Sequence, residues 1–504
     1  MVNNQREEWG TRVGYILAAM GMAIGTGNIW RFPRMVAENG GGSFLIGWAI
    51  FLFLWSFPLI MVEMVVGRKT RLGTTGSFRD FVGRKYTWMG GFITWVCIFI
   101  TFYYSVVVGW TIKYASLAIG GAFHSGVDTN KLWETFTTNP AQTISFHFMA
   151  IVLSGIVVYF GVKRGIEAAS KFLLPALFVL LIVAVIKSLS LDGAMAGLAY
   201  MFTPDPAYLV KADTWLQALS QSAWSTGAGW GLYATYAIYT RKKEDIAQNA
   251  LTAGMGNNTV ELLAGMAIIP AIFALAPSAE YMHQAMSSGN TGITFIYMAQ
   301  LFGKMPGGYF MSVVFFIALA FAAISSLIAM VEFATRNFMD FGMDRHRAIV
   351  WVVAVCFLMG IPSAISMDIF NNQDWVWGIG LLFSCLFYAI AAIQYGVEKM
   401  RDEDVNPVSD IKLGNWFVFS IKYCIPVIFV FFLGWWLWQA VTWYPDNWWD
   451  PKEVFSVGTI VVQVVFAFAV VGILNGWFNK MIKRPYGSQM ADSGKQNAKL
   501  GRGM

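Results

Sequence analysis

The sequence predicts an all-α integral membrane protein with about twelve transmembrane helices, and three observations carry this prediction. Of the 504 residues, 57% are hydrophobic and only 13% are charged, whereas a soluble domain carries about 25% charged residues. Apolar runs of about 20 residues, the length that crosses a bilayer as a helix, recur along the whole chain. Basic residues gather in every second connection between these runs, as they do in multi-pass membrane proteins.

Each expected span is an apolar run bounded by polar or charged connections. In order, the runs centre on residues 16–37, 44–66, 89–117, 144–160, 173–189, 216–239, 250–275, 310–333, 349–365, 376–392, 416–438 and 457–478. No cleavable signal peptide is expected before the first run, because residues 1–8 are polar and carry three charges.

The placement of the basic residues predicts the topology. The net charge is +6, and about half of the 35 lysines and arginines lie in or beside the connections after the second, fourth, sixth, eighth and tenth spans. By the positive-inside rule these connections and both termini are cytoplasmic, and we expect the chain in the cell (plasma) membrane. No nucleic-acid partner is expected, because the charges are spread over short turns. The residues concerned are Arg68, Lys69, Arg71, Arg79, Arg84, Lys85, Lys163, Arg164, Lys171, Arg241, Lys242, Lys243, Arg336, Arg345, Arg347, Lys399 and Arg401.

Neither a metal centre nor an enzyme site is expected. The four cysteines, Cys97, Cys356, Cys385 and Cys424, fall in apolar spans, so they form no extracellular disulfide framework and lack the spacing of metal ligands. The four histidines are scattered, and no span carries a nucleophile beside a base.

The first span is interrupted by glycines. Gly21, Gly25 and Gly27 fall within seven residues, and the polar Asn28 follows them. Glycine weakens a helix by about 1 kcal/mol relative to alanine, and backbone can leave the helix at membrane depth only where it is buried in protein or lines a cavity. Such a break frees carbonyl groups for a cation and amide groups for an anion, which is how secondary transporters build their binding sites.

The sixth span carries a second break, at Gly227, Gly229 and Gly231. Paired interruptions at corresponding positions of two halves are typical of an inverted-repeat transporter, although close helix packing would explain either break singly. We therefore expect an N-terminal segment (1–10), a first repeat of helices 1–5 (11–200), a second repeat of helices 6–10 with opposite topology (213–398), helices 11 and 12 (412–482) and a cytoplasmic tail (483–504).

Several short motifs are informative together: GNIWRFP at 27–33, ENGGGSF at 38–44, PLIMVE at 58–63, GR at 67–68, RKKED at 241–245 and AAISS at 322–326. In order and spacing they resemble the signatures of the neurotransmitter:sodium symporter family, in its branch of prokaryotic amino-acid transporters. The similarity runs from Trp9 to about Phe478. It implies a 5+5 inverted repeat with discontinuous helices 1 and 6, followed by two further helices.

The resemblance also implies two sodium ions. One site would use the carbonyls of Gly21, Ile24 and Ala322 and the hydroxyls of Ser325 and Ser326. The other would use the Ala23 carbonyl, Asn28, Ser225 and Asn257, and the substrate carboxylate would complete it. A shared ligand would couple the two affinities, because each bound species raises the affinity of the other by the same factor. The serines could instead make ordinary intrahelical hydrogen bonds, and the asparagines could join helices.

The resemblance places the substrate beside the second of these sodium ions. Its carboxylate would meet the amides of Thr26 and Gly27 and the hydroxyl of Tyr104. Ala23, Gly25, Ile100, Trp224, Ser225, Gly227, Trp230, Ser326 and Met330 would complete the pocket. Monoamine-carrying relatives have aspartate where this chain has Gly25, so the glycine implies an amino acid whose own carboxylate is recognised. Because the pocket wall carries no charged group, the substrate side chain should be neutral; its size stays open.

Glu261 lies one helical turn after Asn257, on the same side of the seventh span. Chloride-dependent relatives have a neutral residue at this position, and Trp48 stands where they have a chloride-binding tyrosine. Both differences predict that no chloride is required. A buried carboxylate can also take up a proton when sodium leaves, so we expect proton antiport through Glu261. A purely structural buried glutamate is the alternative.

The family pattern assigns further residues around the pathway. Glu63 would bond the broken backbone of the sixth span. Arg31 and Asp374 would close the outer side, and Arg6, Asp340, Trp9 and Tyr239 would close the inner side. Exposed ion pairs are worth about 0–1 kcal/mol, which suits contacts that must open. Arg6 lies in a polar segment and could equally be a solvated or topology-determining charge.

The sequence therefore predicts a sodium-coupled symporter that imports small neutral amino acids by alternating access. An osmolyte symporter of the same fold stays open, because Trp224 and Trp230 could surround the quaternary amine of a betaine-like or taurine-like solute. A sensor that binds its solute without accumulating it is the other alternative, and uphill uptake distinguishes the two classes. The resemblance is compatible with a homodimer.

Overall fold

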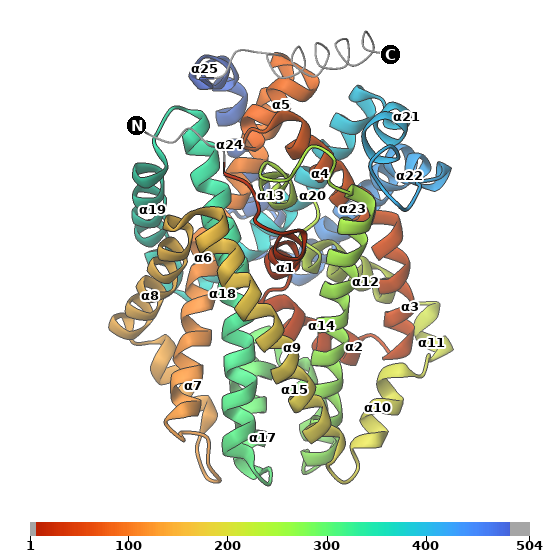
Figure 1. Cartoon of the computed structure of the whole chain (residues 1–504). Coiled ribbons are helices and arrows are strands. Elements are labelled where there is room, and N and C mark those ends of the chain that lie inside the picture. Colours follow the sequence, from red (N-terminus) through yellow and green to blue (C-terminus); the bar gives the residue numbers. More distant parts are fainter. Residues whose placement is uncertain (1–6, 484–504) are drawn as a thin grey trace.

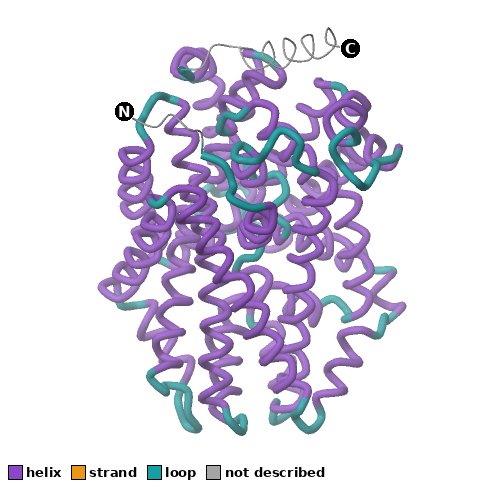
Figure 2. The backbone as a smooth tube through the Cα atoms, viewed as in Figure 1, coloured by secondary structure: helices purple, strands orange, loops and turns teal. Residues whose placement is uncertain are grey.

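The computed structural model describes residues 7–483 as a bundle of helices (Figure 1). The described residues contain no β-strand, and an isolated bridge joins Gly41 to Pro204 (Figure 2). Apolar runs fold as helices in a bilayer because every backbone N–H and C=O group must find its partner within the segment. The predicted all-α membrane class is confirmed.

The helices follow the apolar runs of the sequence. The first half contains α1 (Arg12–Ala23), α2 (Phe32–Glu38), α3 (Gly42–Phe51), α4 (Phe57–Thr70), α5 (Thr74–Val82), α6 (Thr87–Ile119), α7 (Thr129–Thr137), α8 (Pro140–Tyr159), α9 (Ala168–Leu189), α10 (Ala194–Phe202), α11 (Pro206–Leu209), α12 (Ala212–Ser225) and α13 (Leu232–Ala237). The second half contains α14 (Ile246–Leu275), α15 (Ala279–Ser287), α16 (Gly289–Thr291), α17 (Ala299–Lys304), α18 (Gly308–Asp340), α19 (Arg345–Ile365), α20 (Met367–Tyr395), α21 (Val397–Lys399), α22 (Asn415–Phe419), α23 (Ile425–Trp443), α24 (Val457–Ile473) and α25 (Asn475–Met481). Short 3₁₀ and π-helical segments join them: η1 (Gly27–Arg31), η2 (Leu52–Ser56), η3 (Arg84–Tyr86), η4 (Val162–Glu167), η5 (Gly292–Met298), η6 (Met400–Val405) and η7 (Ser420–Cys424).

The number of membrane crossings agrees with the prediction. Nine helical stretches of the described chain are long and apolar enough to cross a bilayer, and eleven if each of two bent pairs is one span. In one pair α1 meets the η1–α2 stretch at 58°, and in the other α24 meets α25 at 51°. The remaining predicted span consists of α12 and α13, which are two short pieces.

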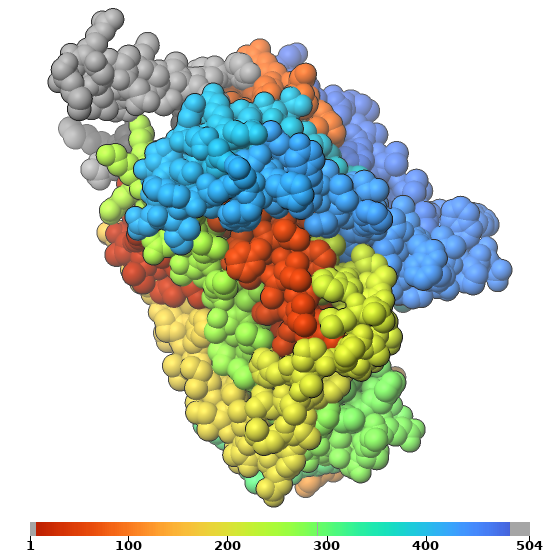
Figure 3. Space-filling model, turned by 90° about the vertical axis from the view of Figure 1, so that its right-hand side faces the viewer, coloured from red at the N-terminus to blue at the C-terminus, as the bar shows by residue number. Residues whose placement is uncertain are grey.

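The central helices and the outer helices differ in burial. In the most apolar part of α6, α18 and α20, 78% of the residues are buried, against 39% for the spans that contain α8, α9, α19 and α23. The outer helices turn large apolar side chains outwards, as contact with lipid requires. α3 does the same with Ile46 and Ile50, as η2 does with Phe53, and Figure 3 shows this red segment at the surface.

The connections gather at two opposite ends of the bundle (Figure 1). α5, α21, α22 and α25 lie at one end, and α7, α11, α15 and α17 lie at the other. The first end holds connections that are predicted to be cytoplasmic, such as those around Arg84 and Lys399. The second holds the connections that are poor in basic residues. Connections therefore alternate between two sides, as they do in a multi-pass membrane protein.

The break in the first span is shorter than its glycines suggested. α1 ends at Ala23, Ile24 is extended with ψ 104°, and the π-helical η1 begins at Gly27. The expectation that Gly21 belongs to the break is wrong, because Gly21 is helical. Its missing side chain serves packing instead, since an added Cβ would lie 2.5 Å from Cδ2 of Leu174.

The break in the sixth span is longer and depends on glycine at three positions. α12 ends at Ser225, and Gly227, Gly229 and Gly231 have φ values of 69°, 84° and 81° before α13 begins. Side chains other than glycine are strained at positive φ. An added Cβ at Gly229 would also lie 2.1 Å from the sulfur of Cys385, so this part of the break touches α20 directly.

Candidate substrate and ion site

A cavity of about 610 Å³ lies between the two broken helices, α6 and α18. All residues predicted for the substrate pocket line it: Ala23, Gly25, Thr26, Gly27, Ile100, Tyr104, Trp224, Ser225, Gly227, Trp230, Ser326 and Met330. Gly289 and Thr291 of α16 line it too, so the cavity extends towards the end of the bundle that holds α15 and α17. An aromatic group that the sequence analysis did not identify lines the same extension: Phe370, Trp375, Trp435, Trp436, Trp443 and Phe455.

The break in the first span presents a small polar corner of this cavity. The amide of Thr26 donates to the Tyr104 hydroxyl across 3.3 Å. An added Cβ at Gly25 would lie 2.8 Å from that hydroxyl oxygen and 3.1 Å from Oγ of Ser326, whereas one at Gly27 would meet nothing within 4 Å. Position 25 therefore admits no side chain unless Tyr104 or Ser326 moves. N–H groups at the start of a helical segment are suited to bind an anion.

Two serine hydroxyls of α18 lie against the end of α1. Oγ of Ser326 donates to the carbonyls of Met22 and Ile24, each across 3.0 Å. Oγ of Ser325 lies 2.8 Å from the Ala322 carbonyl and 3.4 Å from the Ile24 carbonyl. Hydroxyl and carbonyl oxygens thus converge from two helices without a charged group, a set of ligands that suits a hard cation. Met22 is an addition to the predicted set, and Gly21 packs beside Ser325.

Two buried asparagines meet beside the same break. Nδ2 of Asn28 donates to Oδ1 of Asn257 across 2.9 Å, and Oδ1 of Asn28 accepts from the amide of Gly25 across 2.8 Å. Ala23 and Ser225 line the cavity next to them. Buried amides are costly unless they are bonded, so the two asparagines satisfy each other and join α14 to the break. Asn28 and Asn257 therefore make a contact between helices, and the same two side chains belong to the predicted ion site.

Glu261 is fully buried in α14 and accepts hydrogen bonds on both carboxylate oxygens. Nε1 of Trp48 donates to Oε2 across 2.8 Å, and Nε2 of Gln221 donates to Oε1 across 2.5 Å. Gln221 in turn accepts from Arg31 across 2.9 Å. The tryptophan at position 48 therefore contacts the carboxylate at position 261. Gln221 was missed by sequence reasoning, although a polar residue inside a span is a signal of function.

Glu63 of α4 bonds the break in the sixth span. Its Oε1 accepts from the amide of Gly229 across 2.5 Å, and its Oε2 accepts from the amide of Ala234 across 3.4 Å. Backbone amides that leave a helix need acceptors, and a buried carboxylate needs donors. The Glu63 carboxylate and these backbone amides therefore satisfy one another's hydrogen-bonding groups where α12 and α13 separate.

The predicted closure of the outer side is not formed. Among the described residues Arg31 and Asp374 make no ion pair with each other, although both line the cavity. Arg31 donates instead to Oγ of Ser220 across 2.7 Å and to Gln221. These neutral partners come from α12, beside η1, and the cavity remains continuous from Gly25 to its aromatic extension.

The predicted inner side is closed by aromatic packing around Trp9. This side chain is 6% exposed, and its indole N–H donates to the carbonyl of Tyr236 across 3.0 Å. The backbone amide of Trp9 donates to the carbonyl of Tyr239 across 3.2 Å. Asp340 accepts from Arg336 and from the amide of Gly73. Arg6, its expected partner, lies outside the described residues.

A second buried charge cluster at the inner side was missed by the sequence analysis. Glu332 of α18 is fully buried and accepts from Nη2 of Arg345 across 2.6 Å. The hydroxyl of Tyr239 donates to Glu332 across 2.5 Å, and Glu7 lies 3.4 Å from Nη1 of Arg345. The cluster links α18, α19, the segment after α13 and the segment before α1. The signal for it was a glutamate inside an otherwise apolar span.

Comparisons with known proteins agree with this architecture. The family model of the sodium:neurotransmitter symporter family matches residues 6–139 and 131–479. An uncharacterised sodium-dependent transporter of Methanocaldococcus jannaschii is 30% identical over 499 residues, which cover 94% of this chain and 99% of the relative. A sodium-dependent neutral amino acid transporter of Rattus norvegicus, B(0)AT2, is 22% identical over 85% of this chain and 72% of the relative.

Among solved structures, that of MhsT in complex with L-phenylalanine superposes with a TM-score of 0.77. The two sequences are 29% identical, and the match covers 85% of this chain and 99% of MhsT. The relatives are transporters and not enzymes. The chain has a multi-pass helical fold like that of these proteins, and it is a sodium-dependent transporter that belongs to the sodium:neurotransmitter symporter family.

Proposed function

We propose that the protein imports neutral amino acids together with two sodium ions, that it needs no chloride, and that Glu261 carries a proton in the opposite direction. The observation that carries the proposal is the cavity at the two breaks, which has a polar corner at Gly25, Thr26 and Tyr104 and uncharged side chains around that corner. The uptake follows an alternating-access cycle in which spans 1, 2, 6 and 7 rock against the other helices.

The two groups of oxygen ligands support sodium coupling. The hydroxyls of Ser325 and Ser326 and the carbonyl of Ile24 lie within hydrogen-bonding distance of one another. Asn28 and Asn257 bond beside the polar corner. A sodium ion at the asparagines would lie next to the carboxylate of a bound amino acid, and this proximity would couple the two binding events.

The space around the polar corner supports a zwitterionic, side-chain-neutral substrate. Gly25 leaves no room for the aspartate of monoamine carriers, because Tyr104 and Ser326 fill the place of its Cβ. The wall formed by Ile100, Trp224 and Met330 carries no charge that could pair with a charged side chain. Two similar proteins agree in substrate class, since one is described as a neutral amino acid transporter and MhsT holds L-phenylalanine.

The environment of Glu261 supports chloride independence and proton antiport. Trp48 and Gln221 direct their N–H groups at the carboxylate, so an anion is already fixed in this position by the chain itself. A buried carboxylate beside a cation site is stabilised as an anion while the cation is bound and takes up a proton more readily once the cation leaves. The proton would then return to the outside with the empty carrier.

Uptake into proteoliposomes tests the proposal. Labelled neutral amino acids are offered under an imposed sodium gradient, with chloride replaced by gluconate. Uphill, sodium-dependent uptake of one group is expected. Saturable binding without accumulation would instead indicate a sensor, and uptake of a betaine-like solute alone would indicate an osmolyte carrier. We also propose that both termini lie in the cytoplasm and that the protein resides in the plasma membrane, so protease added outside intact cells should leave both termini uncut.

Glu261→Gln and Glu261→Ser separate the proton pathway from transport itself. Wild-type uptake without chloride should alkalise the lumen in a substrate-dependent way that a trapped pH dye records, because each proton leaves as substrate enters. The variants should lose this signal and regain uptake only when chloride is supplied. Normal chloride-free uptake by both variants would refute the role of Glu261.

A further inference from the structure

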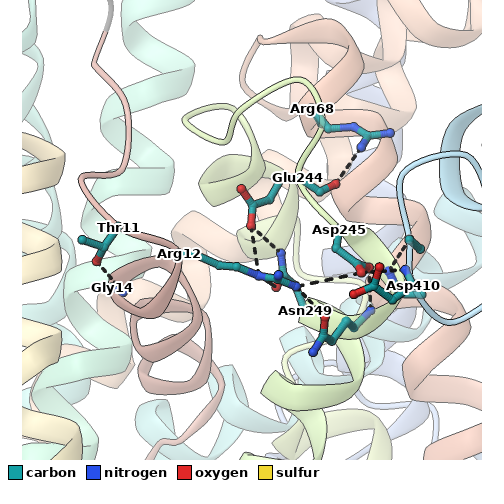
Figure 4. A network of polar contacts seen from close by, with 11 residues as sticks. Thr11, Arg12, Gly14, Arg68, Glu244, Asp245, Asn249 and Asp410 are labelled. Atoms are coloured by element: carbon teal, nitrogen blue, oxygen red, sulfur yellow. Dashed lines mark hydrogen bonds and ion pairs between the residues drawn. The ribbon is translucent and has the colours of Figure 1, made fainter.

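The first turn of α1 is held by charged side chains from two sides. Glu167 of η4 approaches it from the α9 arm. Arg12, on α1 itself, reaches towards the start of α14, and Figure 4 shows these contacts around Glu244 and Asp245. The two sides belong to different parts of the predicted topology. α14 is span 7, which is proposed to move together with α1, whereas the η4–α9 arm is span 5, which is not in the moving group.

Glu167 contacts the start of α1 through both carboxylate oxygens. Oε2 accepts from the amide of Gly10 across 2.6 Å, and Oε1 accepts from the hydroxyl of Thr11 across 2.9 Å. Thr11 is the N-cap of α1, and its hydroxyl oxygen also accepts from the amide of Gly14 across 3.0 Å. A negative charge at a helix N-terminus is stabilising, and Glu167 is only 2% exposed.

Two glycines make the approach of Glu167 possible. An added Cβ at Gly14 would lie 2.2 Å from Oε1 of Glu167 and 2.4 Å from its Cδ. An added Cβ at Gly10 would lie 3.1 Å from Oε2 and 2.9 Å from a side-chain carbon of Lys163. The carboxylate thus occupies the space that a side chain at position 14 would need. Neither glycine has a positive φ, so this space is the structural reason for glycine there.

Arg12 makes its contacts on the opposite side and within the predicted moving group. Its Nη2 donates to Oε1 of Gln248 across 2.7 Å, and its Nε lies 3.5 Å from Oε1 of Glu244. The backbone of Glu244 also accepts from Arg68 of α4 across 2.9 Å. Spans 1, 2 and 7 are therefore tied together at this end, independently of Glu167 (Figure 4).

We propose that Glu167 is a positioning residue that latches α1 to the η4–α9 arm and that its two bonds to Gly10 and Thr11 must break before the inner side can open. The inference rests on the alternating-access cycle of the proposed function. The contacts of Arg12 stay intact in this step, because α1 and α14 move as one group. The latch sets how often the outward-facing chain changes to the inward-facing state.

Lys171 makes the latch reversible. Its ammonium group lies 2.6 Å from Oε1 of Glu167, one helical turn further along the same arm, so it stays beside the carboxylate when α1 departs. A carboxylate left without any partner in a buried place would oppose opening strongly. With Lys171 present and 42% of its side chain exposed, the released charge keeps a partner and reaches water.

Thiol labelling of α1 tests the latch. A single reporter, Ala19→Cys, is placed in a full-length chain in which Cys97, Cys356, Cys385 and Cys424 have been replaced. Ala19 is 1% exposed and belongs to α1, so a membrane-impermeant maleimide added from the cytoplasmic side reaches it only when the inner side opens. Glu167→Gln should raise the labelling rate about tenfold at unchanged thermal stability, because the opening equilibrium shifts by that factor.

Arg12→Gln is the matched control, since it removes a charge from the same turn of α1. Its labelling rate should stay within about twofold of the parent. An unchanged rate in Glu167→Gln, or an equal rise in both variants, would overturn the latch. The assay needs no substrate, so a protein that fails to take up amino acids still gives a decisive labelling result.

Gly14→Ala provides an independent route if Glu167→Gln does not accumulate in the membrane. The added methyl group displaces the Glu167 carboxylate without altering it, so labelling should rise in the same direction. Gly434→Ala is its control, because an added Cβ there meets nothing within 4 Å. An unchanged rate in Gly14→Ala, or the same rise in Gly434→Ala, would contradict the proposal.

Discussion

The outer and inner sides of the pathway are built in opposite ways. On the outer side, Arg31 bonds the neutral side chains of Ser220 and Gln221, and a continuous cavity runs from Gly25 to aromatic side chains of α20 and α23. On the inner side, Trp9 is packed against Tyr236, and Glu332 and Arg345 form a buried ion pair. The closed side therefore holds a buried ion pair and aromatic packing, whereas Arg31 and Asp374 on the open side make no ion pair with each other among the described residues. In an alternating-access carrier the two sides must exchange these roles.

Filling position 25 should have the largest effect on substrate binding, because the added side chain occupies the polar corner of the cavity. Gly25→Asp places a Cβ 2.8 Å from the Tyr104 hydroxyl oxygen and adds a carboxylate where the substrate carboxylate is proposed to bind. Affinity for a neutral amino acid should fall by at least about 100-fold, or about 2.7 kcal/mol. Equilibrium binding of the labelled substrate measures this loss.

Gly472→Ala is the control for that experiment, because its Cβ would meet nothing within 4 Å and this position does not line the cavity. It should bind substrate with an affinity close to that of the parent. Undiminished binding by Gly25→Asp would mean that the substrate carboxylate lies elsewhere in the cavity.

Breaking the inner ion pair should destabilise the closed side. Glu332→Gln leaves Arg345 without its buried carboxylate partner, and a change of this kind costs about 3–5 kcal/mol. Thermal unfolding in detergent should show a lower midpoint. The double variant Glu332→Gln with Arg345→Gln should recover part of the loss, since no unpaired charge remains. Equal losses in the single and the double variant would show that the pair contributes through packing alone.

Glu63 lies between the two sides, and its loss should have an intermediate effect. Glu63→Gln weakens the charged hydrogen bond to the Gly229 amide and places an N–H group opposite that of Ala234. We expect a loss of about 2 kcal/mol in the free energy of unfolding. Glu398→Gln is the control, because this carboxylate pairs with Lys422 at the surface with 51% of its side chain exposed. An equally large loss of unfolding free energy in Glu398→Gln would contradict the conclusion that Glu63 stabilises the break in the sixth span.

Arg31→Gln should have the smallest effect on stability. Its partners Ser220 and Gln221 are neutral and remain able to bond water or each other, so the loss should be below about 1 kcal/mol. Arg345→Gln, tested by the same unfolding assay, should cost more, because it strands Glu332 in the interior. If Arg31→Gln and Arg345→Gln lost similar amounts of unfolding free energy, the inner side would not hold stronger contacts than the outer side.

Much of this site could be predicted because its signals are local. Gly25, Gly27 and Asn28 are neighbours in the chain, and Gly227, Gly229 and Gly231 follow one another at alternate positions. Such breaks are readable from helix propensity and from the demands of the bilayer on backbone groups. The residues of the cavity wall then followed from the family motifs.

The remaining features depend on contacts between distant segments. The bond between Trp48 and Glu261 joins residues that are 213 positions apart, and the contact of Glu167 with Gly10 joins residues 157 positions apart. Glu332 and Glu167 are carboxylates in or beside apolar spans, which is a visible signal, but the sequence does not name their partners. The length of the first break was also misjudged, because the close approach of Leu174 and not the backbone explains Gly21.

The helix α18 fixes the spacing between the proposed ion site and the inner ion pair. Ser326, Met330 and Glu332 lie on α18 within seven residues, so a helix rise of about 9 Å separates the proposed ion ligand from the inner ion pair. A continuous helix does not stretch, so α18 keeps a constant distance between the proposed ion ligand and the inner ion pair. Inserting one residue between Ser326 and Glu332 would turn the glutamate by about 100° away from Arg345 while leaving the serine in position. The number of residues between Ser326 and Glu332 on α18 thus sets the distance between the proposed ion site and the inner ion pair.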